Sequence, residues 1–171
     1  MERPRWVLLV YRLPREPSRH RVAVWRKLRD LGALYLKDGV AALPEDAVTR
    51  EQLEWLQLRV REVGGEATLW EARPGTAAEE AELVGTFRSS REEAYRAIIA
   101  DAERLRRKAQ MGGEGLSEQL GKLEREFRAE RRRDYFRSPL RGEAAAALKA
   151  AREAVRGHDA TAGTARTEGE G

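Results

Sequence analysis

The chain has 171 residues, a formal net charge of +4 and a sequence isoelectric point of about 9.7. This length suits one domain of ordinary size, or a small domain with a helical appendage. The absence of cysteine excludes a disulfide framework, thiolate metal sites and a redox-active thiol. No apolar run is long enough to span a bilayer, and residues 1–4 lead into a predicted strand without the apolar core of a signal peptide, so we expect a cytoplasmic protein with no membrane partner.

The chain opens with a predicted strand and a predicted helix. Residues 6–13 form a near-continuous apolar run, which is typical of a central strand, and Pro14 ends it. Ser18 stands where an N-cap side chain would accept from the first amides of a helix that ends before Gly32. The apolar stripe of this helix is predicted to consist of Val24, Trp25, Leu28 and Leu31.

A hairpin, a second helix and a last strand follow. Residues 33–37 and 40–43 flank the turn dipeptide Asp-Gly and predict the hairpin. Residues 49–52 (TREQ) match a capping box that begins with Thr49, and two glycines at 64 and 65 end the helix. Residues 67–72 form the fourth strand. The order β-α-β-β-α-β predicts an α+β fold with a ferredoxin-like domain over residues 1–75.

The rest of the chain predicts a helical extension over residues 76–156. Two amphipathic stripes indicate a helical hairpin joined by the glycine-rich turn at 111–115, and an alanine-rich helix near 140–156 should pack on this hairpin or on a second subunit. From residue 157 no periodic apolar residues remain, so 157–171 is predicted to be a disordered tail. The two stripes are Tyr95, Ile98, Ala102 and Leu105, and Leu116, Leu120, Leu123 and Phe127.

Several residue types carry no catalytic or metal-binding signal. The two histidines, His20 and His158, are too far apart to indicate a metal site, and no phosphate-binding loop or nucleophile motif is present. We therefore expect no cofactor, no metal and no enzymatic activity. Tryptophans belong to a protein core more often than to base-stacking surfaces, so we predict that all four are core residues. Trp55 fits the apolar stripe of its helix least well.

Two sequence runs resemble a known family. They are VLLVYRLPREPSRHRVAVWRKLRDLGALYLKDGVAALPE and EWLQLRVREVGGEATLWEA, and they resemble the N-terminal domain of ChrB, the chromate-resistance regulator of bacteria. The likeness continues more weakly in FRSSREEAY and RRRDYFRSPLR, and covers residues 5–156. Longer members of the family continue into a second domain, so the resemblance implies a stand-alone N-terminal domain with a role in chromate-responsive regulation.

Two arginine clusters are candidate surfaces for DNA or an oxyanion such as chromate. Residues 1–29 contain nine arginines and lysines against two glutamates, a local balance of +7. Arginine forks bind phosphate and other oxyanions in a bidentate geometry. Solvated helix faces and intrahelical ion pairs are the alternative explanation, above all for the second cluster. The candidate binding residues are Arg12, Arg15, Ser18, Arg19 and Arg21 in the first cluster and Arg131, Arg132 and Arg133 in the second.

Arg12 also bears on catalysis. Small metal-dependent nucleases of CRISPR adaptation share the predicted topology and carry a metal-binding aspartate at the end of the first strand, where this chain has Arg12. An arginine cannot bind Mg²⁺, so we expect no such nuclease activity. A salt bridge from Arg12 to Asp38 or Glu71 is the structural alternative.

Two functions remain open. In the first, which the resemblance favours, the chain is a regulatory module whose arginines contact DNA phosphate or chromate. In the second, it is a non-catalytic interaction subunit that dimerises or binds a separately encoded partner. Binding to duplex DNA that depends steeply on salt would favour the first function.

Overall fold

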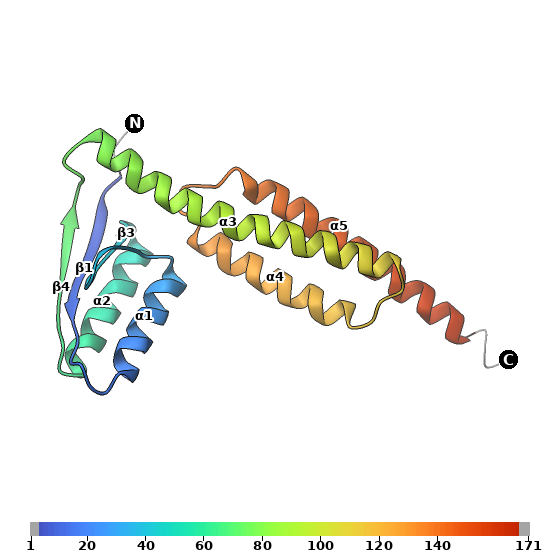
Figure 1. The fold of residues 1–171 in the computed structure, drawn as a ribbon, viewed down its shortest axis with the longest axis horizontal. Helices are drawn as coiled ribbons and strands as arrows, with labels where there is room; N and C mark the ends of the chain where they lie inside the picture. Colours follow the sequence, from blue (N-terminus) through green and yellow to red (C-terminus); the bar gives the residue numbers. More distant parts are fainter. Residues whose placement is uncertain (1–3, 168–171) are drawn as a thin grey trace. The chain divides into compact units, whose positions relative to one another are not determined.

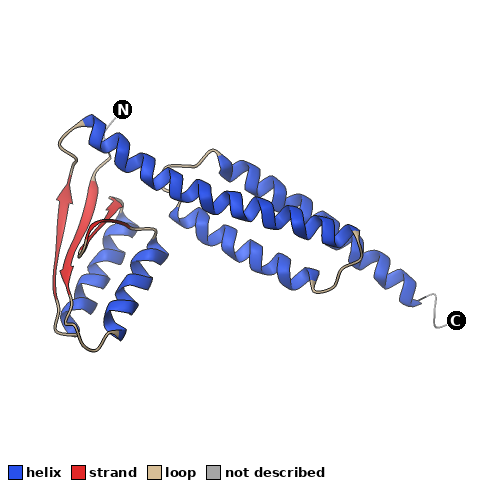
Figure 2. Cartoon of the chain, in the orientation of Figure 1, coloured by secondary structure: helices blue, strands red, loops and turns tan. Residues whose placement is uncertain are grey.

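The computed structural model describes residues 4–167 and divides into two compact units, Met1–Phe87 and Arg88–Gly171. Over the described residues, Figure 2 shows strands only in the first unit. The elements are β1 (Trp6–Arg12), α1 (Arg19–Leu31), β2 (Leu34–Lys37), β3 (Val40–Pro44), α2 (Ala47–Glu62), β4 (Glu66–Ala72), α3 (Ala77–Gln110), α4 (Leu116–Arg133) and α5 (Leu140–Thr167). The fold is therefore of the mixed α+β type.

The four strands form one antiparallel sheet in the order β2-β3-β1-β4, which confirms the predicted four-stranded antiparallel sheet. The apolar first strand is central, as its composition predicts, and α1 and α2 cover one face (Figure 1). Leu9 is fully buried and pairs with Ala41 on β3 and Leu69 on β4. Leu28 of α1 and Leu53 of α2 are also fully buried and supply the helical side of the core.

Trp6 is the tryptophan that belongs to the core of this unit. It is 1% exposed and its ring lies 5.5 Å from that of Phe87. The prediction of core tryptophans is wrong for Trp25, Trp55 and Trp70, which are 46%, 60% and 58% exposed. Successive strand residues face opposite sides of a sheet, so Trp70 lies on the side opposite to its half-buried neighbour Leu69, while smaller residues already fill the inner faces of the two helices.

The ends of α1 match the prediction in part. Gly32 ends the helix in the left-handed conformation (φ 72°), where backbone N–H groups donate to the Arg29 and Leu28 carbonyls. Ser18 occupies the N-cap position, but its backbone is already helical and its side chain makes no capping hydrogen bond. The expected Ser18 cap is therefore wrong, because a capping side chain needs an extended N-cap backbone to turn back onto the helix amides.

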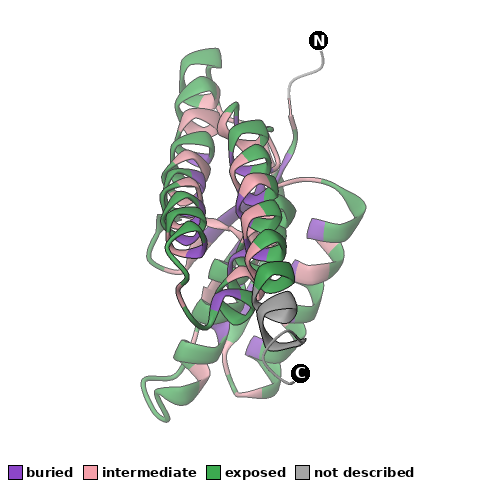
Figure 3. Ribbon diagram, turned by 90° about the vertical axis from the view of Figure 1, so that its right-hand side faces the viewer, coloured by how far each residue is buried: buried purple, intermediate pink, exposed green. Residues whose placement is uncertain are grey.

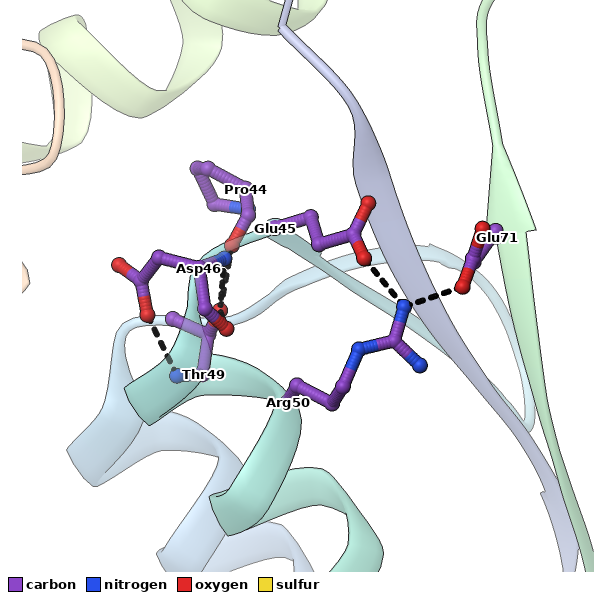
Figure 4. A network of polar contacts seen from close by, with 6 residues as sticks. All are labelled: Pro44, Glu45, Asp46, Thr49, Arg50 and Glu71. Carbon is purple, nitrogen blue, oxygen red and sulfur yellow. Dashed lines mark hydrogen bonds and ion pairs between the residues drawn. The ribbon is translucent and has the colours of Figure 1, made fainter.

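The start of α2 differs from the predicted capping box. Asp46, not Thr49, is the N-cap residue, because its backbone is extended and its Oδ1 accepts from the Thr49 N–H at 2.7 Å. The Thr49 hydroxyl accepts from the Asp46 N–H at 2.9 Å and donates to the Pro44 carbonyl at 2.6 Å (Figure 4). Thr49 is 2% exposed, so its side of the reciprocal cap is buried, whereas Asp46 is exposed.

The second unit is a bundle of α3, α4 and α5 around one apolar core. The predicted helical hairpin and the packing of the last helix on it are confirmed, because buried residues from all three helices form this core. Figure 3 marks the buried positions in purple, and most of the helical surface is exposed. The core consists of Tyr95, Ile98, Ala102, Leu105, Ala109, Leu116, Leu123, Ala144, Leu148, Ala151 and Val155.

The end of the chain is more helical than predicted. The predicted disordered tail begins at residue 157, whereas α5 continues to Thr167, and residues 168–171 lie outside the described residues. The segment contains no proline, so nothing in the backbone stops the helix after Gly157. The Thr161 hydroxyl donates to the Gly157 carbonyl at 2.7 Å, which is a bond made within a helix.

The boundary between the two units also differs from the predicted position. The helical extension begins at Ala77 as predicted from residue 76, but the first turns of α3, up to Phe87, belong to the first unit. None of the helices in the described part of the chain combines the length and the apolar character needed to cross a bilayer.

Candidate anion-binding site

Two glycine-containing turns hold the end of β1 in place. The Tyr11 N–H donates to the Gly39 carbonyl at 2.7 Å on one side of the strand. On the other side, a Cβ atom at Gly65 would lie 2.6 Å from the carbonyl oxygen of Arg12. Only glycine allows this close approach of two backbones. The turn between α2 and β4 is therefore packed directly against Arg12.

This turn and the end of β1 enclose a surface pocket of about 450 Å³. The Arg12 and Arg15 side chains are exposed there, and within the described part of the chain neither forms an ion pair. Glu66, the register partner of Arg12 across β1 and β4, supplies the single carboxylate of the lining. Two guanidinium groups against one carboxylate give the pocket an excess of positive charge. Its lining residues are Arg12, Leu13, Pro14, Arg15, Gly64, Gly65 and Glu66.

The remaining residues of the first predicted cluster lie beyond this pocket. Ser18, Arg19 and Arg21 are exposed at the start of α1 and do not line the pocket. The first turn of α1 contains no acidic residue, so the positive end of the helix dipole and these two arginines have the same sign. The structure therefore brings Arg12 and Arg15 together and places Arg19 and Arg21 on the adjoining helix.

The second predicted cluster is divided between surface and internal contacts. Arg133 is 20% exposed in its side chain and donates to Glu130 at 3.0 Å. The Arg131 guanidinium carbon lies 5.9 Å from the centre of the Phe127 ring, and Arg132 is exposed. Arg133 is thus engaged in the bundle, whereas Arg131 and Arg132 present their charge to solvent.

A polar cluster beside these arginines joins α3 to the end of α4. The Tyr95 hydroxyl donates to Asp134 Oδ2 at 3.1 Å, and the Ser138 N–H donates to Asp134 Oδ1 at 2.9 Å. Arg91 forms an ion pair with Glu130, with both side chains 15% exposed. Desolvation by burial, and then the negative charge of Asp134, raise the pKa of Tyr95 above its ordinary value.

Sequence reasoning did not predict this cluster, although its two segments carried the weaker part of the family resemblance. FRSSREEAY contains Arg91 and Tyr95, and RRRDYFRSPLR contains Asp134 and Ser138. The bundle brings these distant segments into contact. The contacts are internal to the unit, and both oxygens of the buried Asp134 carboxylate accept hydrogen bonds in them.

An ion-pair network at the start of α2 was also not predicted. Arg50 forms ion pairs with Glu45 and with Glu71 of β4 (Figure 4). The hydrogen bonds that Arg50 donates to Glu45, and secondly to Glu71, raise the pKa of Arg50. Glu71 was the predicted alternative partner of Arg12, but it is occupied by Arg50, and neither it nor Asp38 pairs with Arg12 in the region that the structure describes. Arg12 therefore lines the pocket without an ion pair to either of these two carboxylates.

Among residues 4–167 no three His, Cys, Asp or Glu side chains gather in a group that could hold a metal ion. Arg12, not a carboxylate, stands at the end of β1.

Comparison with known protein families gives a match over most of the chain. The family model described as Protein ChrB, N-terminal, matches residues 21–165. No curated protein and no solved structure matches the chain. The match begins inside α1, so it includes Arg21 and the second arginine cluster, whereas Arg12 and Arg15 precede it. Because the match covers most of the 171 residues, the chain belongs to the family of ChrB N-terminal domains and is a protein related to chromate resistance.

Proposed function

We propose that this protein is a chromate-responsive regulator that binds an oxyanion, either chromate or a DNA phosphate, through Arg12 and Arg15. The observation that carries the proposal is the pocket of about 450 Å³ that Arg12 and Arg15 line beside the Gly64-Gly65 turn, with neither arginine in an ion pair within residues 4–167. A tetrahedral oxyanion accepts from an arginine fork with two oxygens at once, which matches a lining of this kind.

The arginines of α1 extend this surface toward DNA. Arg19 and Arg21 are exposed at a helix start without acidic residues, and helix N-termini favour anionic groups. In the proposed mechanism, Arg19 and Arg21 contact the phosphate backbone, and an oxyanion in the pocket competes with a neighbouring phosphate for Arg12 and Arg15. Chromate would then weaken the binding of DNA.

The experiment separates the two ligands. Chromate, sulfate and a duplex DNA are titrated against the wild-type chain, Arg12→Ala/Arg15→Ala and Arg19→Ala/Arg21→Ala, with circular dichroism as the check on folding. We expect the first variant to lose chromate binding. The second should keep chromate binding, and the slope of log affinity against log salt for DNA should fall by about one for each phosphate that the variant no longer neutralises.

Sulfate, a tetrahedral dianion of the same charge, tests specificity. Equal binding of sulfate and chromate would reduce the pocket to a general oxyanion site. If both variants bind chromate and DNA as the wild type does, the arginines are a solvated surface, and the interaction-subunit function replaces the regulator.

We also propose that the sheet unit is ferredoxin-like, which is supported by the position of β3 between β1 and β2. For this unit we propose no metal-dependent nuclease activity, since Arg12 stands where the related nucleases carry a metal ligand. Repurified protein should leave DNA and RNA intact with Mg²⁺ or Mn²⁺. Cleavage that a chelator abolishes would contradict the proposal.

A further inference from the structure

A groove of about 420 Å³ lies between α1 and α2 on the surface of the first unit. Val24 and Leu56, each 5% exposed, belong to its lining, and Trp55 is 60% exposed beside them. The lining consists of Ala23, Val24 and Lys27 from α1 and Gln52, Trp55, Leu56 and Arg59 from α2. A large apolar side chain thus stands open to solvent at an apolar depression.

The exposed side of α2 has the spacing of a helix-binding surface. Val48, Gln52, Trp55 and Arg59 follow one another at intervals of four, three and four residues, so they share one stripe of the helix. At a rise of 1.5 Å per residue this stripe is about 16 Å long, or about three turns. Val48 is 65% exposed, so the stripe presents two large apolar side chains. Amphipathic helices bind such grooves with apolar side chains at matching intervals, and tryptophan is enriched among the residues that dominate binding energy.

The basic residues around the groove indicate the charge of its binding partner. α1 carries five basic residues against one acidic residue, Asp30. Lys27 lines the groove and forms no ion pair within residues 4–167. Arg59, on the opposite wall, forms an exposed ion pair with Glu62 at 3.0 Å, and a pair of this kind contributes little to stability and is easily exchanged. A cation on each wall favours a ligand with carboxylates on both sides of its apolar face.

From this geometry and charge we propose that the groove between α1 and α2 binds an acidic amphipathic helix of a protein partner. Trp55 packs against the apolar face of that helix, and Lys27 and Arg59 pair with its flanking carboxylates. This surface is separate from the Arg12–Arg15 pocket, since no residue lines both. The protein can therefore bind its partner whether or not the proposed oxyanion site exists.

The test uses the full chain and a designed probe. The probe is a fluorescein-labelled peptide of about 18 residues, or about five helical turns, with leucines along one face and glutamates on both flanks. Fluorescence anisotropy measures its affinity for the wild type, Trp55→Ala, Lys27→Glu and Trp70→Ala. Trp70 is the matched control, because it is 58% exposed in the same unit but lies on β4.

We expect Trp55→Ala and Lys27→Glu each to weaken binding about tenfold, and Trp70→Ala to leave it unchanged. A peptide with lysines in place of glutamates, and a scrambled peptide of the same composition, should not bind. Circular dichroism confirms that each variant is folded. Absence of binding by the acidic peptide, equal binding of either control peptide, or an equal effect of Trp70→Ala would overturn the proposal.

Two further measurements test other occupants. If Trp55→Ala weakens duplex DNA binding as strongly as peptide binding, the groove is a nucleic-acid surface and the proposal fails. If sedimentation shows a dimer of the wild type that Trp55→Ala dissociates, the occupant is a second copy of the chain and the proposal fails as well. Retention of peptide binding by Arg12→Ala/Arg15→Ala would show that the groove acts independently of the oxyanion pocket.

Discussion

Replacing Gly65 by alanine tests how the fold builds the anion pocket. The new Cβ atom would lie 2.6 Å from the Arg12 carbonyl oxygen, 2.7 Å from Val60 Cγ1 and 2.9 Å from the Val60 carbonyl oxygen. All three are shorter than normal carbon contacts, and two of the three atoms belong to the backbone, which cannot rotate away. The φ angle of Gly65 is outside the left-handed region, so the penalty comes from these contacts and not from backbone strain.

Overpacking of this kind costs about 1–3 kcal/mol of the free energy of unfolding. In a unit of this size each kcal/mol lowers Tm by roughly 4–8 °C. Displacement of the Arg12 backbone should also weaken chromate binding at the pocket. The matched control is Gly85→Ala, since a Cβ there meets no atom within 4 Å and alanine stabilises a helix interior by about 1 kcal/mol.

Tryptophan fluorescence during urea unfolding is the suitable assay, because all four tryptophans lie in the first unit. We expect Gly65→Ala to lower the urea midpoint and Gly85→Ala to raise it or leave it unchanged. A Gly65→Ala protein with the wild-type midpoint and wild-type chromate affinity would refute the role assigned to the contact between the turn and β1.

Three further predictions concern the polar contacts. Tyr95→Phe removes the donor to the buried Asp134 carboxylate and should destabilise the helical unit by about 1.5–3 kcal/mol, measured by circular dichroism during urea unfolding; a change below about 0.5 kcal/mol would mean that the bond is not stabilising. Arg50→Ala leaves Glu45, whose side chain is 16% exposed, without its cationic partner and should lower the urea midpoint of the first unit, measured by tryptophan fluorescence; an unchanged midpoint would contradict this. Burial, and then the hydrogen bond with Tyr11, raise the pKa of Tyr35. The stability that the neutral Tyr35 phenol contributes is therefore complete below the ordinary phenol pKa of about 10 and is lost as pH rises above that value. Absorbance titration at alkaline pH should show one late-ionising phenol fewer in Tyr35→Phe, and an identical titration would contradict the assignment.

The sequence by itself determined the order and type of the elements in the first unit. Pro14 ends β1, Gly32 ends α1 and the Gly64-Gly65 pair ends α2, as predicted. These residues act through their own backbone conformations, which need no distant partner. The apolar composition of β1 likewise predicted its central place in the sheet.

The helical unit was predicted from its periodic stripes, with one exception. Tyr95, Ile98, Ala102 and Leu105 are buried, as their spacing requires. The end of α5 was placed too early, because the absence of periodic apolar residues after residue 156 says nothing about helix formation in a segment without proline.

Only the tertiary structure decided which side chains meet. The contact of Tyr95 with Asp134 joins residues 39 positions apart, and no local pattern encodes it. The choice of Asp46 over Thr49 as the N-cap depended on the path of the chain after β3, where the Pro44 carbonyl accepts from Thr49.

In the candidate site too, the sequence predicted the residue types, whereas the tertiary structure decided which of them lie together. The sequence identified the excess of arginines in its first 29 residues, but not that Arg12 and Arg15 would share a pocket with Gly64, Gly65 and Glu66. That pairing follows from the register of β1 against β4. The sequence showed that Trp55 fits its apolar stripe poorly but did not decide its exposure, because a tryptophan near an apolar stripe is buried or exposed according to how closely the neighbouring helix packs. Local conformation depends on a few adjacent residues, whereas pockets and grooves arise from the spacing between elements, which the whole core sets.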